Sequence, residues 1–118
     1  MPTIQLKRIY EPAEPSDGFR VLVDRLWPRG VSKEEAKIDL WAKDITPTTE
    51  LREDFHSGHE DWPAFEHDYR AELAQNPAFN DFIDQIKDKK TVTLLFAAKD
   101  VEHTHAKVLL AALEAKLR

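Results

Sequence analysis

Residues 20–30 read RVLVDRLWPRG, and this stretch constrains the fold more than any other part of the 118-residue chain. Its apolar segment, Val21–Val23, is short and contains β-branched residues, which is typical of a strand buried on both faces of a sheet. Pro28 and Gly30 then favour a turn. The stretch therefore predicts a buried strand that runs directly into a charged turn.

Two more strands are expected on either side of this one in the sequence. Residues 3–9 alternate between apolar and polar side chains, and residues 91–96 form a second strongly apolar run. Residues 38–41 favour a further brief extended segment.

Helical patterns separate these strands. Capping-box spacing from Ser32 predicts a short helix that starts at Lys33. Thr46 followed by Pro47 is typical of an N-cap and a first helical residue. Three further helices are expected, one from Trp62, one from Pro77 and one over Val101–Leu117. Strands that alternate with helices indicate a single compact α/β domain over residues 1–118, with a small, mostly parallel sheet covered by helices.

The composition excludes several classes of protein. The chain has no cysteine, which excludes disulfides, thiolate nucleophiles and cysteine-ligated metal centres. The longest apolar run has six residues, far short of the roughly 20 that a membrane span needs. We therefore expect a cytoplasmic protein with no membrane partner and no cofactor.

Charge is unevenly distributed along the chain. Residues 44–90 carry five Lys/Arg and twelve Asp/Glu, whereas the two flanking segments are nearly balanced. Proteins that bind duplex nucleic acid usually carry a basic stretch, and this chain has no long one. Binding of bulk nucleic acid is therefore not expected, although a local basic pocket is compatible with the sequence.

The turn after the second strand is the first candidate site. Arg25 and Arg29 lie four residues apart, and their planar guanidinium groups suit bidentate binding of a carboxylate or phosphate. Trp27 could stack on a planar ligand. The alternative interpretation is structural, with Asp24 paired to an arginine and Trp27 filling the core.

The segment after the last strand is the second candidate site. Lys99 could hold an anion, and His103 or His105 could transfer protons near neutral pH. Asp100 is expected to cap the final helix. The alternatives are a plain polar helix start and a metal site at the two histidines, although His-x-His converges poorly on a helix.

Residues 20–30 also resemble the opening motif of the YeaO-like family of uncharacterised bacterial proteins, domain of unknown function four-eight-eight. The likeness continues through Trp41–Asp44, Leu51-Arg52 and Phe55-His56, and it closes with residues 94–105. It covers essentially the whole chain. The resemblance implies one α/β domain and implies no established function.

A more distant likeness is to rhodanese-type domains, through Val23–Arg25 and residues 95–105. Rhodanese sulfur transfer uses a cysteine just after the later strand. The corresponding stretch here, Phe96–Lys99, has no thiol. Sulfurtransferase and thiol-phosphatase activities are therefore excluded.

Parallel sheets bind ligands beyond the carboxyl ends of their strands, where both candidate loops are expected to meet. The leading hypothesis is a protein that binds a phosphorylated or nucleotide-like anion there. Arg25, Arg29 and Lys99 would hold the anion, Trp27 and Trp41 would wall the pocket, and Asp24 or Asp100 would orient a catalytic histidine. The alternatives are a non-catalytic protein-interaction module, whose acidic middle third meets a basic partner, and a metal-dependent hydrolase.

Overall fold

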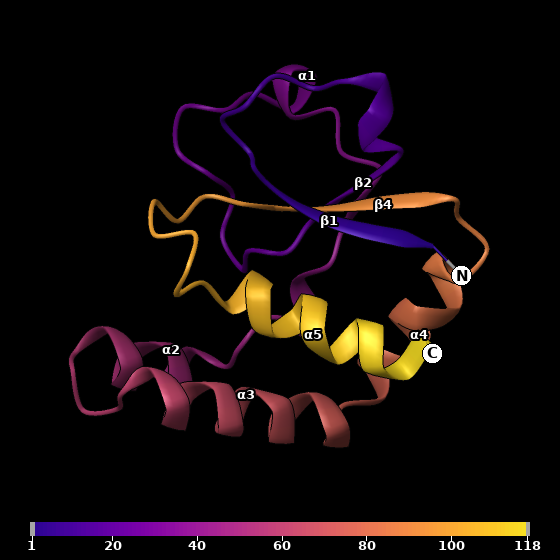
Figure 1. The fold of residues 1–118 in the computed structure, drawn as a ribbon. Coiled ribbons are helices and arrows are strands. Elements are labelled where there is room, and N and C mark those ends of the chain that lie inside the picture. Colours follow the sequence, from indigo (N-terminus) through magenta and orange to yellow (C-terminus); the bar gives the residue numbers. More distant parts are fainter. Residues whose placement is uncertain (1, 118) are drawn as a thin grey trace.

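The apolar segments form one parallel sheet in the computed structural model, which describes residues 2–117 (Figure 1). The strand order is β1-β4-β2-β3, and every neighbouring pair is parallel. The strands span Thr3–Arg8 (β1), Phe19–Leu22 (β2), Leu40–Trp41 (β3) and Thr91–Phe96 (β4). The predicted α/β class and parallel sheet are confirmed, and β2 and β4 are direct neighbours.

Five α-helices and two short 3-10 helices connect the described strands. The α-helices span Lys33–Ala36 (α1), Thr49–His56 (α2), Trp62–Gln75 (α3), Pro77–Ile86 (α4) and His105–Leu117 (α5). The 3-10 helices span Pro15–Asp17 (η1) and Lys43–Ile45 (η2). None of these helices is both long enough and apolar enough to cross a bilayer.

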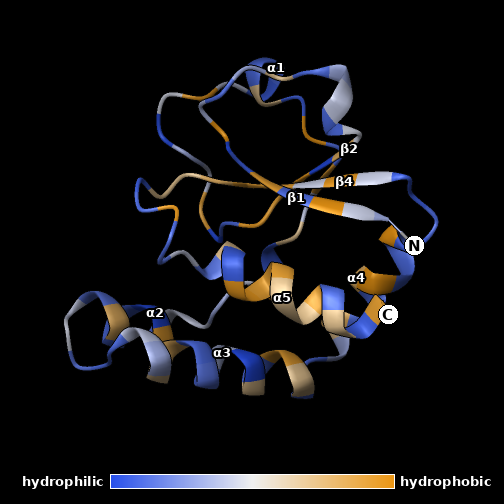
Figure 2. Ribbon diagram, in the orientation of Figure 1, coloured by the Kyte–Doolittle hydropathy of each residue, from blue (hydrophilic) through white to orange (hydrophobic). Residues whose placement is uncertain are grey.

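The sheet buries both of its faces, as the apolar runs predict. On one face, Val21 and Leu94 join the large core formed with α3, α4 and α5. On the other face, Leu22 and Leu95 pack in a smaller cluster with Ala36 of α1. Figure 1 shows α3, α4 and α5 on one side of the sheet and α1 on the other, and Figure 2 shows hydrophobic residues along the strands and along α4 and α5.

Helix α1 begins where its capping box predicts. The Ser32 side chain accepts a hydrogen bond from the backbone N–H of Glu35, and the Glu35 carboxylate accepts one from the N–H of Ser32. Two of the backbone N–H groups that the helix start leaves without an internal partner are thus satisfied locally.

Two other helix starts differ from the sequence prediction. Helix α2 begins at Thr49 and not at Pro47, because Thr48 is the cap and accepts from the N–H of Leu51. Helix α5 begins at His105 and not at Val101. The Asp100 carboxylate binds the N–H groups of Glu102 and His103 and holds them in a separate turn. The expected cap role of Asp100 on the last helix is therefore wrong.

A buried charge cluster ties the start of β2 to β1 and α1. Asp17 and Arg20 are only 2% and 4% exposed, and they form an ion pair. The Lys7 ammonium lies 3.0 Å from the Asp17 carboxylate, and the Arg20 guanidinium also donates to the carbonyl of Ala36 at 2.7 Å. We call Lys7, Asp17 and Arg20 the buried ion cluster.

Desolvation by itself raises the pKa of Asp17, but hydrogen bonds from the backbone of Glu14 and from Lys7 and Arg20 outweigh it. The net result is a pKa below the ordinary aspartate value. The pKa of Lys7 is raised, because its bonds to Asp17 and Glu14 outweigh the opposite effect of burial. The cluster thus favours the charged form of both groups.

Candidate functional site

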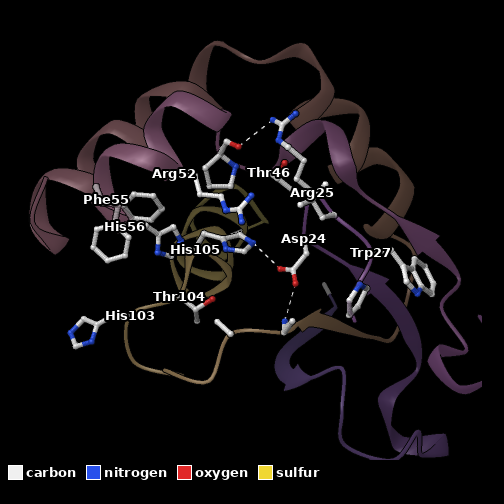
Figure 3. A pocket seen from close by; sticks show the side chains of 16 residues that line it. Asp24, Arg25, Trp27, Thr46, Arg52, Phe55, His56, His103, Thr104 and His105 are labelled. Atoms are coloured by element: carbon white, nitrogen blue, oxygen red, sulfur yellow. Dashed lines mark hydrogen bonds and ion pairs between the residues drawn. The ribbon is translucent and has the colours of Figure 1, made fainter. Parts of the chain in front are cut away.

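A pocket of about 320 Å³ opens beyond the carboxyl ends of β2 and β4 (Figure 3). The loops after these strands form one part of its wall, and residues of α2 form another. The lining side chains that carry polar groups are Asp24, Arg25, Thr46, Arg52, His56, His103, Thr104 and His105, together with Trp27. The pocket lies where parallel sheets generally bind ligands.

Asp24 joins the two loops at the base of this pocket. One of its carboxylate oxygens, Oδ2, accepts from the backbone N–H of Ala97 at 2.9 Å, directly after β4. The other, Oδ1, lies 3.3 Å from Nε2 of His105. The Asp24 backbone carbonyl accepts from the indole of Trp41 at 2.8 Å. Asp24 therefore holds its own loop against the end of β4 and has no oxygen without a neighbour.

His105 is fixed at the first residue of α5. Its Nε2 lies 2.6 Å from the backbone carbonyl of Val23, an atom that can only accept a hydrogen bond. Nε2 must therefore carry a hydrogen. The Tyr69 ring packs edge-on against the imidazole, and the Tyr69 hydroxyl donates to the carbonyl of Ile45. Burial raises the pKa of Tyr69, so this hydroxyl stays protonated.

Arg25 and Arg52 bring two cations to the pocket. Arg25 donates one hydrogen bond, to the carbonyl of Pro47 at 3.1 Å, and within residues 2–117 it has no carboxylate partner. The Arg52 guanidinium, on α2, has no hydrogen-bond or ion-pair partner in that same part of the chain. Figure 3 shows Arg52 beside His105, with Arg25 on the neighbouring loop. The pocket therefore carries positive charge that the described residues leave unneutralised.

Aromatic rings form the wall on the α2 and α3 side. Phe55 stacks on Phe65 with ring centroids 4.7 Å apart, and the His56 ring lies 5.7 Å from Phe55. Leu26, in the loop after β2, also lines the pocket and is 65% exposed. The pocket thus offers apolar surface next to its two guanidinium groups.

His103 lies at the outer edge of the pocket. Its Nδ1 is 2.9 Å from the Asp100 carboxylate, and its ring packs edge-on against Trp62. The bond to His103 and the bonds from the backbone N–H groups of Glu102 and His103 lower the pKa of Asp100. Asp100 itself is exposed and does not line the pocket.

The structure separates several residues that the sequence places together. Asp24, Arg25, Trp27, His103 and His105 line the pocket, whereas Arg29, Trp41, Lys99 and Asp100 do not. The side chains of Arg29 and Lys99 are exposed and lie outside the pocket lining. The expected cluster of Arg25, Arg29 and Lys99 around one concavity does not occur in this pocket.

Of the two tryptophans expected to wall the pocket, Trp27 lines it and Trp41 does not. They pack edge-to-face with centroids 5.3 Å apart, and Lys43 lies over the Trp41 ring at 4.2 Å. Trp41 thus contributes indirectly, because its indole N–H binds the backbone carbonyl of Asp24, a residue of the pocket lining. The Trp27 indole donates to the Val31 carbonyl, which closes its own turn.

Sequence reasoning missed Arg52, His56, Thr46 and Thr104 as pocket residues. The available signal was the charge balance, because Arg52 is one of only five basic residues in the acidic middle third. The metal interpretation of His103 and His105 finds no support in the geometry, because no group of three or more His, Asp or Glu within residues 2–117 is arranged to hold a metal ion.

Comparison with known proteins places this architecture in a family. A profile described as "Inactive DUF488-N3 subclade" matches residues 3–118. The chain belongs to the DUF488 family. The resemblance carried by residues 20–30 and 94–105 is thereby confirmed.

The DUF488 relatives include bacterial proteins of nearly the same length. The chain is 50% identical to "Uncharacterized protein YeaO" of Escherichia coli (strain K12) over 106 residues, which is 90% of this chain and 92% of that protein. It is 37% identical to an uncharacterized protein of Mycobacterium tuberculosis (strain ATCC 25618 / H37Rv) over 106 residues, or 90% and 89% of the two chains. No solved structure gives a significant match to this DUF488 chain.

Proposed function

We propose that this DUF488 protein binds an anionic small molecule, phosphorylated or nucleotide-like, in the pocket and does not transform it. The observation that carries the proposal is the pair Arg25 and Arg52, two guanidinium groups that line one pocket and lack a carboxylate partner in residues 2–117. Arginine suits this task because its planar donor array matches phosphate and carboxylate oxygens.

The charge of the pocket contrasts with that of the whole chain. The protein has a net charge of −5, yet the pocket lining includes two arginines and one carboxylate, that of Asp24. The Asp24 oxygens already face the N–H of Ala97 and the ring of His105. An incoming anion would therefore supply the missing negative charge.

The apolar wall favours an organic ligand over a bare ion. Phe55 and Phe65 lie within the lining, and so does the exposed Leu26. Ligand sites typically combine such surface with a few polar groups, and about 320 Å³ is at the small end of their usual range. A phosphate with a compact organic part fits this description.

The chemistry of the lining argues for binding without turnover. The chain has no thiol, and both hydroxyls that line the pocket are engaged: Thr46 donates to the Lys43 carbonyl, and Thr104 accepts from the N–H of Ala106. The Nε2 of His105 is occupied by the Val23 carbonyl. The description of the matched subclade as inactive agrees with this interpretation.

The competing hypothesis of an interaction module, with these residues as a structural ion-pair network, is less well supported. Such a network requires Arg25 to pair with a carboxylate, whereas Arg25 bonds only the carbonyl of Pro47 among the described groups. Asp24 does fit the structural interpretation, because its carboxylate ties its own loop to the backbone after β4.

A thermal-shift screen tests the proposal. Nucleoside monophosphates, sugar phosphates and divalent metals would be compared with neutral nucleosides and sugars, because a ligand that binds the native state raises the midpoint of unfolding. We expect a phosphorylated compound to stabilise the wild-type protein. The variants Arg25→Gln and Arg52→Gln should lose that response, and Arg70→Gln, an exposed arginine of α3 outside the pocket, should keep it.

Two results would contradict the proposal. One is a complete lack of stabilisation by the phosphorylated compounds. The other is an equal response in wild type and in both pocket variants, which would place the binding elsewhere on the surface.

A further inference from the structure

We infer that His105 determines which anions the pocket accepts, by selecting an oxyanion that carries its own O–H donor, such as hydrogen phosphate. This inference rests on the proposed function, since Arg25 and Arg52 would hold the charge. It adds a requirement that the arginines cannot impose, because guanidinium groups only donate hydrogen bonds and do not distinguish a protonated oxyanion from an unprotonated one.

The requirement follows from the way His105 is held. The Val23 carbonyl, 2.6 Å away, fixes the hydrogen of the ring on Nε2, and the Asp24 carboxylate at 3.3 Å faces the same nitrogen. Neutral imidazole has one donor and one acceptor nitrogen. With the donor fixed at the end of β2, Nδ1 is the acceptor, and no residue between positions 2 and 117 supplies it with a hydrogen bond.

The neighbours of His105 do not alter this arrangement. The Tyr69 hydroxyl, on the ring packed against the imidazole, is committed to the Ile45 carbonyl at 2.6 Å. The side chain of His105 is 20% exposed and lines the pocket. A ligand that occupies the pocket therefore meets a nitrogen that can only accept while the ring is neutral.

Hydrogen phosphate and sulfate separate this effect from simple charge attraction. At pH 8 both are mostly tetrahedral dianions of similar size, but only hydrogen phosphate carries an O–H. It can donate that hydrogen to Nδ1 while its other oxygens accept from the arginines. Sulfate would instead place an oxygen lone pair against the nitrogen lone pair. Phosphate gains one hydrogen bond, whereas sulfate leaves Nδ1 unpaired. This difference corresponds to a preference of roughly tenfold for phosphate.

The test is a pair of titrations of the 15N-labelled protein at pH 8 and constant ionic strength, with inorganic phosphate and with sulfate. NMR shifts of the backbone amides report both affinity and location. We expect phosphate to bind about tenfold more tightly than sulfate. In His105→Phe, which keeps an aromatic ring but has no acceptor nitrogen, this preference should disappear. His59→Phe, at an exposed histidine outside the pocket, is the matched control and should retain it.

A second measurement uses the wild-type protein alone, so it does not depend on how the variant folds. Long-range 1H–15N spectra of the imidazoles identify the protonated nitrogen of each ring. His105 should be protonated at Nε2 at pH 8, and phosphate, but not sulfate, should move its Nδ1 resonance in the direction of an accepted hydrogen bond.

The outcomes separate this inference from the proposed function. Equal binding of both anions, or protonation of His105 at Nδ1 at pH 8, would overturn the role of His105 and leave anion binding by the arginines intact. Binding of neither inorganic anion would overturn the inference, because it requires the isolated oxyanion to be recognised. The proposed function would then be decided by the organic phosphates of the thermal-shift screen.

Discussion

Two groups of cations lie at opposite ends of β2, and their surroundings differ completely. At the start of the strand, Arg20 is 4% exposed, and its guanidinium bonds the Asp17 carboxylate and the carbonyls of Ala36 and Lys37. Beyond it, Arg52 is exposed and has no such partner among residues 2–117. A guanidinium whose three nitrogens all bond groups of the protein holds the fold together, whereas one with no such bonds beside a pocket is available to a ligand.

The largest expected effect lies in the buried ion cluster. Asp17→Ala leaves the Arg20 and Lys7 charges buried without their shared carboxylate, and it should cost roughly 3–5 kcal/mol of unfolding free energy. Urea denaturation followed by circular dichroism measures this loss. Asp81→Ala, at an exposed position of α4, is the control and should change stability by less than about 0.5 kcal/mol. A loss at Asp17 as small as at Asp81 would remove the contrast between the two ends of β2.

The same cluster predicts a dependence of stability on pH. Because the pKa of Asp17 is lowered by folding, its contribution is fully present above the ordinary aspartate range and is lost as the pH falls through the folded value. The raised pKa of Lys7 acts in the opposite direction: its contribution is present below the ordinary lysine range and is lost as the pH rises through the folded value. The urea concentration at the midpoint of unfolding should therefore decrease as the pH drops below about 4 and as it rises above about 10.

The variant Asp17→Asn separates the contribution of Asp17 to acid stability from that of the other carboxylates. Asp17→Asn should lose less stability on acidification than the wild type does between pH 5 and pH 2, since it has no charge to lose at this position. Parallel acid profiles of the two proteins would show that another group is responsible.

A smaller effect is expected at Asp24, which stands at the pocket but contacts the protein as a structural residue. Asp24→Ala removes the acceptor of the half-buried Ala97 N–H and should cost roughly 1–3 kcal/mol. Denaturation measurements at pH 7 would check this value. A neutral result would show that Asp24 does not tether its loop to the end of β4, and it would weaken the assignment of His105 to a fixed orientation.

The smallest effect on stability is expected at the pocket arginines. Arg52→Gln should change the unfolding free energy by less than about 0.5 kcal/mol, because the exposed guanidinium makes no hydrogen bond or ion pair within residues 2–117. Arg25→Gln should cost somewhat more, about 0.5–1.5 kcal/mol, through the loss of its bond to the Pro47 carbonyl. A loss at Arg52 comparable to that at Asp17 would show that it belongs to the fold after all.

Local sequence signals determined most of the secondary structure. The boundaries of β4, Thr91–Phe96, follow from its apolar run, and the break between α3 and α4 follows from Asn76 and Pro77. The interactions that decide these features reach only a few residues along the chain: Asn76 caps α4 through the N–H of Ala78. At α5 the sequence pattern placed the helix start too early, because Asp100 holds the N–H groups of Glu102 and His103 in a separate turn.

The membership of the pocket was decided by the tertiary structure. Arg29 lies closer to Arg25 in sequence than Arg52 does, yet Arg52 lines the pocket and Arg29 does not. The sequence by itself determined a parallel α/β sheet with charged loops at one edge, because burial and alternation are properties of single segments. Which cations share a cavity depends on where the tertiary structure places α2 relative to the loop after β2, and that placement sums many weak contacts between segments far apart in the chain.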